Sequence, residues 1–241
     1  MADYRQIIPM FKEKEGGLSK ATTDTQSKNP SPCTHNGLTG VWHTNKGVAY
    51  STFKSLAPKL GYEASCKNFL EMPTEIWGKV FKNGFWDIWG LDNMKSQPIA
   101  NTIVWWSWGS GNGGATTSFK KFLSNKGINV SSRSEIVREL DKLAEIDDNK
   151  LFDELTAHRL NFYATRSTAK ANLRGWTNSY NRFTTFMKGY LGKAKEYGAE
   201  GVAKSFAKDP IKFAKRNWIP ITVLSVVFVG IGFLVVRRIW K

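Results

Sequence analysis

Hydrophobic residues recur along most of the chain with the spacing of a helix. The first such pattern predicts a short helix over residues 3–14, which the Gly16-Gly17 pair ends, and Pro9 marks either its first turn or a kink. Little of the sequence alternates with period two, so we expect a mainly α-helical domain that ends near residue 190. Further helices are predicted over residues 48–60, 72–86, 99–108, 115–124, 134–165 and 178–190.

Three segments of this domain have a distinct composition. Residues 99–108 are strongly apolar but too short to cross a bilayer, so we expect a buried core helix that ends at the glycines of 109–114. Residues 19–40 are rich in Ser, Thr, Asn, Pro and Gly, which is typical of a loop. The acids at the start of residues 134–165 are interpreted as a solvated helix face.

The C-terminal end of the sequence predicts a membrane anchor. Residues 218–236 hold no charge, and 19 residues at about 1.5 Å each span about 30 Å, the thickness of a bilayer core. Trp218 and Trp240 lie near the two ends of the segment, where Trp is enriched. We therefore expect a transmembrane helix rather than a buried core helix. The cations on both sides, including the basic tail 237–241, leave its orientation open.

Residues 191–217 are a basic connector between the domain and this anchor. They carry seven Lys or Arg against three acids, a net charge of +4. Two interpretations remain open: an amphipathic segment that lies on the membrane surface, and a flexible linker.

The net charge and the composition of the chain predict an anionic partner. The 241 residues carry a formal net charge of +15, whose field favours nucleic acid, anionic lipid or bacterial wall polymer. The charge is dispersed and no nucleic-acid-binding motif is present, so nucleic acid is not the expected partner. The ten tryptophans suit a core, but Trp also binds the faces of sugar rings.

The sequence offers little for a metal site or a disulfide scaffold. Cys33 and Cys66 are the two cysteines, and we favour free thiols while one bridge stays possible. Cys33, His35 and His43 lack the spacing of zinc ligands, so we expect neither a metal nor another cofactor. The N-terminus has no apolar stretch long enough for a secretion signal.

Glu15 is the first candidate for chemistry. It stands at the end of the first predicted helix, before two glycines that allow a substrate to approach closely. Asp24 follows nine positions later, and Thr44-Asn45-Lys46-Gly47 leads into the next helix. Glycoside hydrolysis needs a carboxylic acid and, in inverting enzymes, a second group that holds a water. Glu15, Asp24 and Thr44 fit the roles of acid, water-orienting group and hydrogen-bonding partner.

These residues resemble the pattern of glycoside hydrolase family 108, the phage-type N-acetylmuramidases. The shared pattern is E-G-G, an Asp nine positions on, and T-N-x-G before an aliphatic residue. Over residues 4–185 the resemblance continues, in order, through Phe85-Trp86-Asp87, residues 100–123, Ala157 to Tyr163 as A-x-R-L-x-x-Y, and Gly175-Trp176-Thr177-Asn178 as G-W-x-N.

The resemblance implies a lysozyme-like domain over residues 1–190, with a catalytic part at 1–95 and a peptidoglycan-binding-like part at 96–190. It implies that Glu15 is the catalytic acid and that Asp24 and Thr44 assist it. The substrate-binding residues predicted beside them are Asn45, Trp42, Trp86 and Trp106; Trp105 and Trp108 are further candidates for stacking on sugars.

The sequence also departs from the family pattern. Asp24 and Thr44 stand 20 positions apart, where the family has one tight run, so Thr34 and Thr39 compete for the role of Thr44. Later family residues are replaced by Trp105 and Gly109, in place of an Asp and an Asn, and by Ser179, in place of an Arg.

Together these features predict a muramidase that is tethered to a lipid bilayer through residues 218–236. We expect it in the membrane of a bacteriophage virion, among other virion proteins, where it opens the host wall during entry. A bacterial inner membrane is the alternative location. The alternative function is an inactive wall-binding or structural virion protein that keeps the lysozyme fold.

Overall fold

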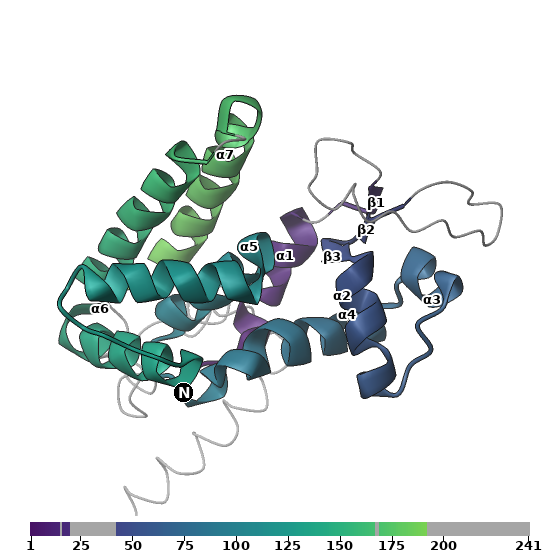
Figure 1. Ribbon diagram of the computed structural model, residues 1–241, viewed down its shortest axis with the longest axis horizontal. Coiled ribbons are helices and arrows are strands. Elements are labelled where there is room, and N and C mark those ends of the chain that lie inside the picture. Colours follow the sequence, from purple (N-terminus) through teal and green to yellow (C-terminus); the bar gives the residue numbers. More distant parts are fainter. Residues whose placement is uncertain (15, 20–41, 167–168, 192–241) are drawn as a thin grey trace, which may run out of the picture. The chain divides into compact units, whose positions relative to one another are not determined.

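The computed structural model describes residues 1–14, 16–19, 42–166 and 169–191, without the side chains of 12–14 and 169–171. Almost all of them belong to one compact unit, Met1–Phe186, while a second unit, Met187–Lys241, lies mostly outside the described residues. The described part is mainly helical (Figure 1). Its longer helices are α1 (Ile8–Lys14), α2 (Tyr50–Leu56), α3 (Cys66–Glu71), α4 (Thr74–Phe81), α5 (Gln97–Ser124), α6 (Arg133–Ala164) and α7 (Ala169–Lys188).

Short helical turns complete the chain between these helices. A 3-10 turn, η1 (Tyr4–Gln6), precedes α1, and Pro9 lies in the first turn of α1, where its missing N–H costs nothing. The helix expected over 72–86 is present as α4 followed by the π-helical segment η4 (Lys82–Trp86). The remaining turns are η3 (Pro58–Leu60), η5 (Asp87–Trp89) and η6 (Leu91–Asn93).

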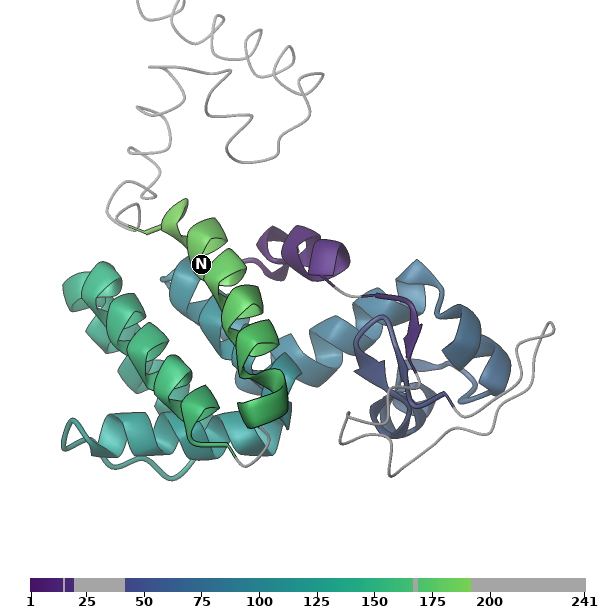
Figure 2. The same cartoon turned by 90° about the horizontal axis from the view of Figure 1, so that it is seen from above.

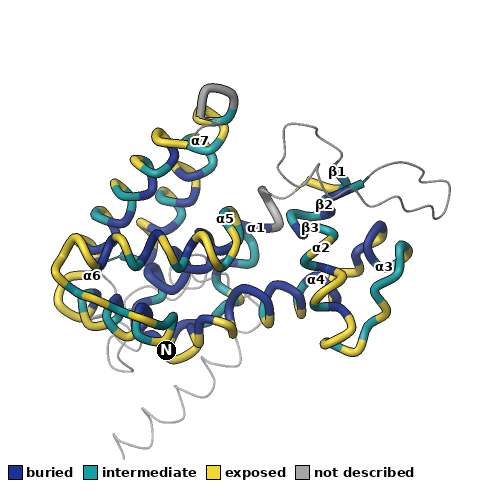
Figure 3. The backbone as a smooth tube through the Cα atoms, in the orientation of Figure 1, coloured by how far each residue is buried: buried dark blue, intermediate teal, exposed yellow. Residues whose placement is uncertain are grey.

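The apolar run at 99–108 forms the centre of the core. Residues 98–107 of α5 are all buried, as the dark-blue stretch of α5 in Figure 3 shows, so the buried core helix is confirmed. The expectation that the glycines after it end this helix, with another helix over 115–124, is confirmed. The backbone leaves helix geometry at Gly111, with φ 70° and ψ 158°, and helix geometry resumes to Ser124. Only glycine adopts that conformation readily, so the glycine run kinks α5.

α6 leaves helix geometry at Asp147, with φ −159° and ψ 97°. The part of α6 after this break lies beside α7 and runs in the opposite direction, as Figures 1 and 2 both show. The Tyr163 ring of α6 lies 5.4 Å from Trp176 and 6.1 Å from Tyr180, both on α7. α7 begins at Ala169, nine positions before the predicted start at 178, because the packing of Trp176 on α6 stabilises a segment whose own sequence is a weak helix former.

A small sheet of three two-residue strands follows α1. The sequence did not predict this sheet, because strands of two residues are too short to show alternation with period two. Its strands are β1 (Leu18–Ser19), β2 (Thr44–Asn45) and β3 (Val48–Ala49), paired antiparallel in the order β1-β2-β3. Lys46 and Gly47 join β2 to β3 with φ of 46° and 76°. Two positive φ values in a two-residue loop are typical of a type I′ turn, which explains the glycine of T-N-x-G.

Asn45 and Lys46 connect this sheet to the end of α3. The last carbonyl groups of a helix have no partner within the helix. The Asn45 side-chain NH2 donates to the carbonyls of Phe69 and Leu70 at 2.6 and 2.9 Å, and Lys46 Nζ donates to the carbonyl of Met72 at 2.7 Å. The hairpin β2–β3 therefore caps α3 and is held in place by it.

Cys66, the first residue of α3, is disulfide-bonded, so the expectation of free thiols is wrong there. The other cysteine of the sequence, Cys33, lies outside the described residues. No helix among the described residues is long and apolar enough to cross a membrane. The predicted linker 191–217, transmembrane helix 218–236 and tail 237–241 fall outside the described residues, except Leu191, and stay predictions.

The Asn45 side chain should be a structural anchor whose loss destabilises the domain. Asn45→Ala leaves two buried carbonyls without donors and should lower the free energy of unfolding by about 2–3 kcal/mol. Urea denaturation measures the loss. The matched control is Asn83→Ala, which removes one exposed bond to the Lys79 carbonyl and should cost less than about 0.5 kcal/mol. Equal losses in the two variants would contradict the capping role.

Candidate functional site

The candidate site surrounds the end of α1. Glu15 follows Lys14, the last residue of α1, and both Glu15 and Asp24 lie outside the described residues. Gly16 and Gly17 are exposed, and no atom lies within 4 Å of the place where a Cβ would stand at either. The backbone next to Glu15 therefore has open space around it, as close approach of a polymer requires.

Strand pairing brings Thr44 back to the end of α1. Thr44 is opposite Ser19 in the register of β1 and β2, and Ser19 is four residues after Glu15. The Lys46 N–H also donates to the Gly17 carbonyl at 3.2 Å. Two segments that are far apart in the sequence thus form one small sheet, and of the predicted catalytic residues it holds Thr44.

His43 is a residue of this site to which sequence reasoning gave no functional role. It is buried, its N–H donates to the Ser19 carbonyl, and its carbonyl accepts from the Tyr50 N–H at 2.9 Å. Its Nδ1 lies 3.0 Å from the Thr44 hydroxyl. The ring is fixed by its burial, so it orients the Thr44 hydroxyl. The sequence shows only that His43 and Thr44 are adjacent, and this does not predict a contact between their side chains.

An aromatic cluster fills the space between α1, α4 and α5. Phe11 lies at its centre, with ring centroids 4.9 Å from Phe81, 5.1 Å from Trp105 and 5.2 Å from Trp108. Trp108 is only partly buried and also contacts Phe85 at 4.7 Å. Because Phe11 precedes Glu15 by about one helical turn, this cluster supports the end of α1.

The predicted substrate-binding tryptophans are placed unequally. Trp42, just before the small sheet, is half-buried. Trp86 and Trp106 are completely buried; Trp86 donates its indole N–H to Asp92 at 2.7 Å, and the Trp106 ring lies 4.3 Å from Phe119. Neither of the two presents a surface to a sugar ring. Trp108 differs from them because it is partly exposed.

Asn45, also predicted to bind substrate, has both hydrogens of its side-chain NH2 bonded to carbonyls of α3, inside the domain. Trp77 binds the same hairpin from the other side, because its indole N–H donates to the Lys46 carbonyl at 3.0 Å. These contacts support the strand that carries Thr44 without facing a ligand.

Glu75, at the start of α4, is a carboxyl group that could compete with Glu15 for the role of acid. The Tyr62 hydroxyl donates to it at 2.6 Å, and Lys79 forms an ion pair with it at 3.1 Å. These contacts, the Tyr62 hydrogen bond first, hold the pKa of Glu75 below its usual value. A general acid needs a raised pKa, so Glu75 is ionised near neutral pH and is a poor proton donor.

The positions that depart from the family pattern lie in the helical part. Trp105 stacks on Phe183 of α7 at 4.7 Å, and Gly109 lies beside the side chain of Arg159. The Ser179 hydroxyl is buried without a hydrogen-bond partner. Among the described residues, no group of three His, Cys, Asp or Glu side chains is arranged to hold a metal ion.

The comparisons with known proteins show the fold. No family model matches the sequence, and no curated protein matches it. The solved structure of SagA from Brucella abortus is similar, with a TM-score of 0.56 and 16% sequence identity, over 77% of this chain and 94% of SagA. The mainly α-helical fold predicted from the sequence is thereby confirmed, and it is similar to that of SagA. Its division into two parts at residue 95 stays a prediction.

Proposed function

We propose that the chain is a peptidoglycan hydrolase, a muramidase in which Glu15 is the general acid. The observation that carries the proposal is the pairing of β1 with β2, which places Thr44 opposite Ser19, four residues after Glu15 in the sequence. This pairing occurs on a fold similar to that of SagA and between residues that resemble the motif of glycoside hydrolase family 108.

The surroundings of α1 suit a proton donor. Phe11, Trp105 and Trp108 form an apolar wall at the helix end that Glu15 follows. A general acid must keep its proton near neutral pH, and a carboxyl group in apolar surroundings does so because burial disfavours its charged form. In the proposed reaction Glu15 donates this proton to the glycosidic oxygen as the bond to the sugar breaks.

Thr44 and Asp24 have the second role. In an inverting mechanism, Asp24 takes a proton from a water while the Thr44 hydroxyl, oriented by His43, holds that water. Trp108 is the proposed platform for a sugar ring, in place of Trp86 and Trp106. Trp108 is partly exposed, and its ring packs on Phe11 of α1.

Charge and redox state support a place at the cell wall. Peptidoglycan carries carboxylates, and a net charge of +15 attracts a polyanion. The disulfide at Cys66 is typical of proteins that work in an oxidising compartment. A tether at 218–236 in a virion membrane, or in a bacterial inner membrane, remains part of the proposal and rests on the sequence.

A non-catalytic wall-binding protein is the second candidate. The 20 positions between Asp24 and Thr44 favour it, because the family keeps these residues in one tight run. The burial of Trp86 and Trp106 does not distinguish the two functions, because a hydrolase and a wall-binding protein both need a folded core.

Glu15→Gln should abolish lysis while leaving the fold intact. The swap keeps the shape and removes the proton donor, so the rate of clearing of purified peptidoglycan by the full chain should fall about 10²–10⁴-fold. Glu63→Gln, the same change at an exposed side chain, is the control and should retain full activity. An active Glu15→Gln variant would exclude the assigned acid. A folded but inert wild type would favour the wall-binding function.

The Thr44 hydroxyl should contribute to the rate and not only to the sheet. Thr44→Val keeps the shape but loses the hydroxyl, and the loss of a hydrogen bond at the reacting water should lower kcat about tenfold or more. Thr44→Ser keeps the hydroxyl and should stay within about threefold of wild type. Equal kcat values for the Val and Ser variants would remove Thr44 from the mechanism.

A further inference from the structure

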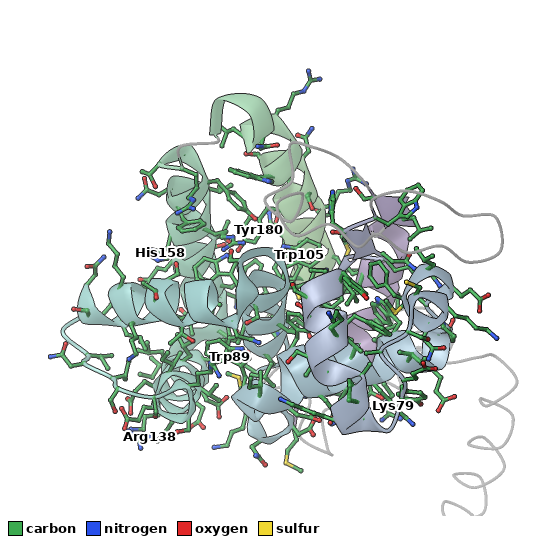
Figure 4. All side chains as sticks on the ribbon, turned by 45° about the vertical axis from the view of Figure 1, so that its right-hand side comes forward. Lys79, Trp89, Trp105, Arg138, His158 and Tyr180 are labelled. Carbon is green, nitrogen blue, oxygen red and sulfur yellow. The ribbon has the colours of Figure 1, made fainter. Side chains whose placement is uncertain are left out.

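Arg159 is a charged side chain enclosed by the helical part of the domain. It belongs to α6 and is only 2% exposed. Its guanidinium carbon lies 4.9 Å from the Trp106 ring, 5.2 Å from Phe162 and 4.6 Å from Tyr163. Three aromatic faces thus surround the cation, and Figure 4 shows the neighbouring His158 of α6 and Tyr180 of α7.

No carboxylate balances this charge. Among the described residues, Arg159 forms no ion pair, and the hydrogen bond at its Nη1 goes to the neutral hydroxyl of Ser110 at 2.9 Å. Its Nε is buried and has no hydrogen-bond partner. Burial without a counter-charge lowers the pKa of the guanidinium. Buried charges in proteins are normally paired, because leaving one unpaired costs several kcal/mol.

Further buried polar groups lie near Arg159. The Thr156 hydroxyl is three residues before Arg159 on the same helix, and the Tyr180 hydroxyl comes from α7. These two hydroxyls interact with each other, and the charge of Arg159 acts on Tyr180. The Tyr180 ring packs on Tyr163, whose own ring is against the guanidinium. The unpaired buried Nε of Arg159 implies a missing hydrogen-bonding partner, and the positive charge of the guanidinium indicates that this partner is an anion.

One edge of the guanidinium lies beside Gly109. In arginine, Nε and Nη2 form this edge, and Nη1, which donates to Ser110, lies outside it. Gly109 is exposed, and a Cβ built on it would lie 3.3 Å from Nη2. The chain then breaks helix geometry at Gly111. An exposed glycine beside a kink therefore lies at the Nη2 end of the edge, whose Nε has no hydrogen-bond partner.

We propose that the Nε–Nη2 edge of Arg159 binds a carboxylate group of a ligand that enters past Gly109, between α5 and α6. A carboxylate is planar and accepts two parallel hydrogen bonds from this edge, and it neutralises the enclosed charge. The Thr156 and Tyr180 hydroxyls are further donors to it. The site does not depend on catalysis by Glu15. Its ligand is either a free small carboxylate or a carboxylate of a wall peptide.

The test follows the Nε–H signal of Arg159 by NMR in the full chain during titration with sodium acetate at constant ionic strength. Absence of the signal in Arg159→Lys assigns it. A saturable shift is expected in the wild type, and Arg159→Lys, which lacks the two-pronged edge, should bind acetate about tenfold more weakly or not at all by calorimetry. A signal that stays unmoved at saturating acetate overturns the proposal.

Two glycine variants keep the test valid if Arg159→Lys fails to fold. Gly109→Ala adds a methyl group beside Nη2 at a helical position and should weaken acetate binding about tenfold. Gly113→Ala, in the same helix with nothing within 4 Å, is the control and should bind like the wild type. Equal affinities of the two variants would overturn the route past Gly109.

A second titration identifies the source of the carboxylate. A soluble disaccharide-peptide from peptidoglycan is added to a Glu15→Gln background, where the proposed cleavage cannot remove it. Tighter binding than acetate, lost in Gly109→Ala, assigns the wall peptide, whereas binding no tighter than acetate assigns a free small carboxylate. If neither probe shifts the Arg159 signal, the site is absent, whatever the lysis assay of Glu15 shows.

Discussion

The packing of Phe11 against α4 and α5 is the contact on which the site depends. Helix α1 has seven residues, and an isolated helix of that length is not stable in water. Its position is therefore set by its buried side chains, above all by Phe11, which contacts Phe81, Trp105 and Trp108. Truncation of a buried Phe typically costs about 3–5 kcal/mol. The position of the end of α1 follows from this contact.

The small sheet depends on tertiary contacts in the same way. Strands of two residues cannot hold a register by themselves. Asn45 and Lys46 fix the hairpin to the end of α3, and Trp77 of α4 binds the Lys46 carbonyl. Thr44 owes its place opposite Ser19 to these anchors, which come from parts of the chain that carry no proposed chemistry.

Asn45 and Arg159 are two buried polar side chains whose hydrogen bonds indicate different roles. Asn45 is buried with the hydrogens of its NH2 bonded to protein carbonyls, so its role is complete within the domain. Arg159 is buried, its Nη1 donates to Ser110, its Nε has no hydrogen-bond partner, and within the part of the chain that the structure describes it forms no ion pair. Both belong to motifs that resemble one family. The hydrogen bonds that each side chain makes distinguish Asn45, which supports the fold, from Arg159, which we propose binds a ligand.

The sequence by itself determined the mainly helical class, the buried run at 99–108, the break in the glycines after it and the order of the motif residues. These features follow from local periodicity and composition, which are properties of neighbouring residues. The tertiary structure decided that the helix over 134–165 breaks at Asp147, that α7 begins at Ala169, that Trp86 and Trp106 are core while Trp108 is partly exposed, and that His43 orients Thr44. Some of these features depend on contacts between segments that are distant in the chain. Others depend on which side of a helix faces the core. A pattern read along one segment does not contain that information, because the partner that completes the contact lies elsewhere in the sequence.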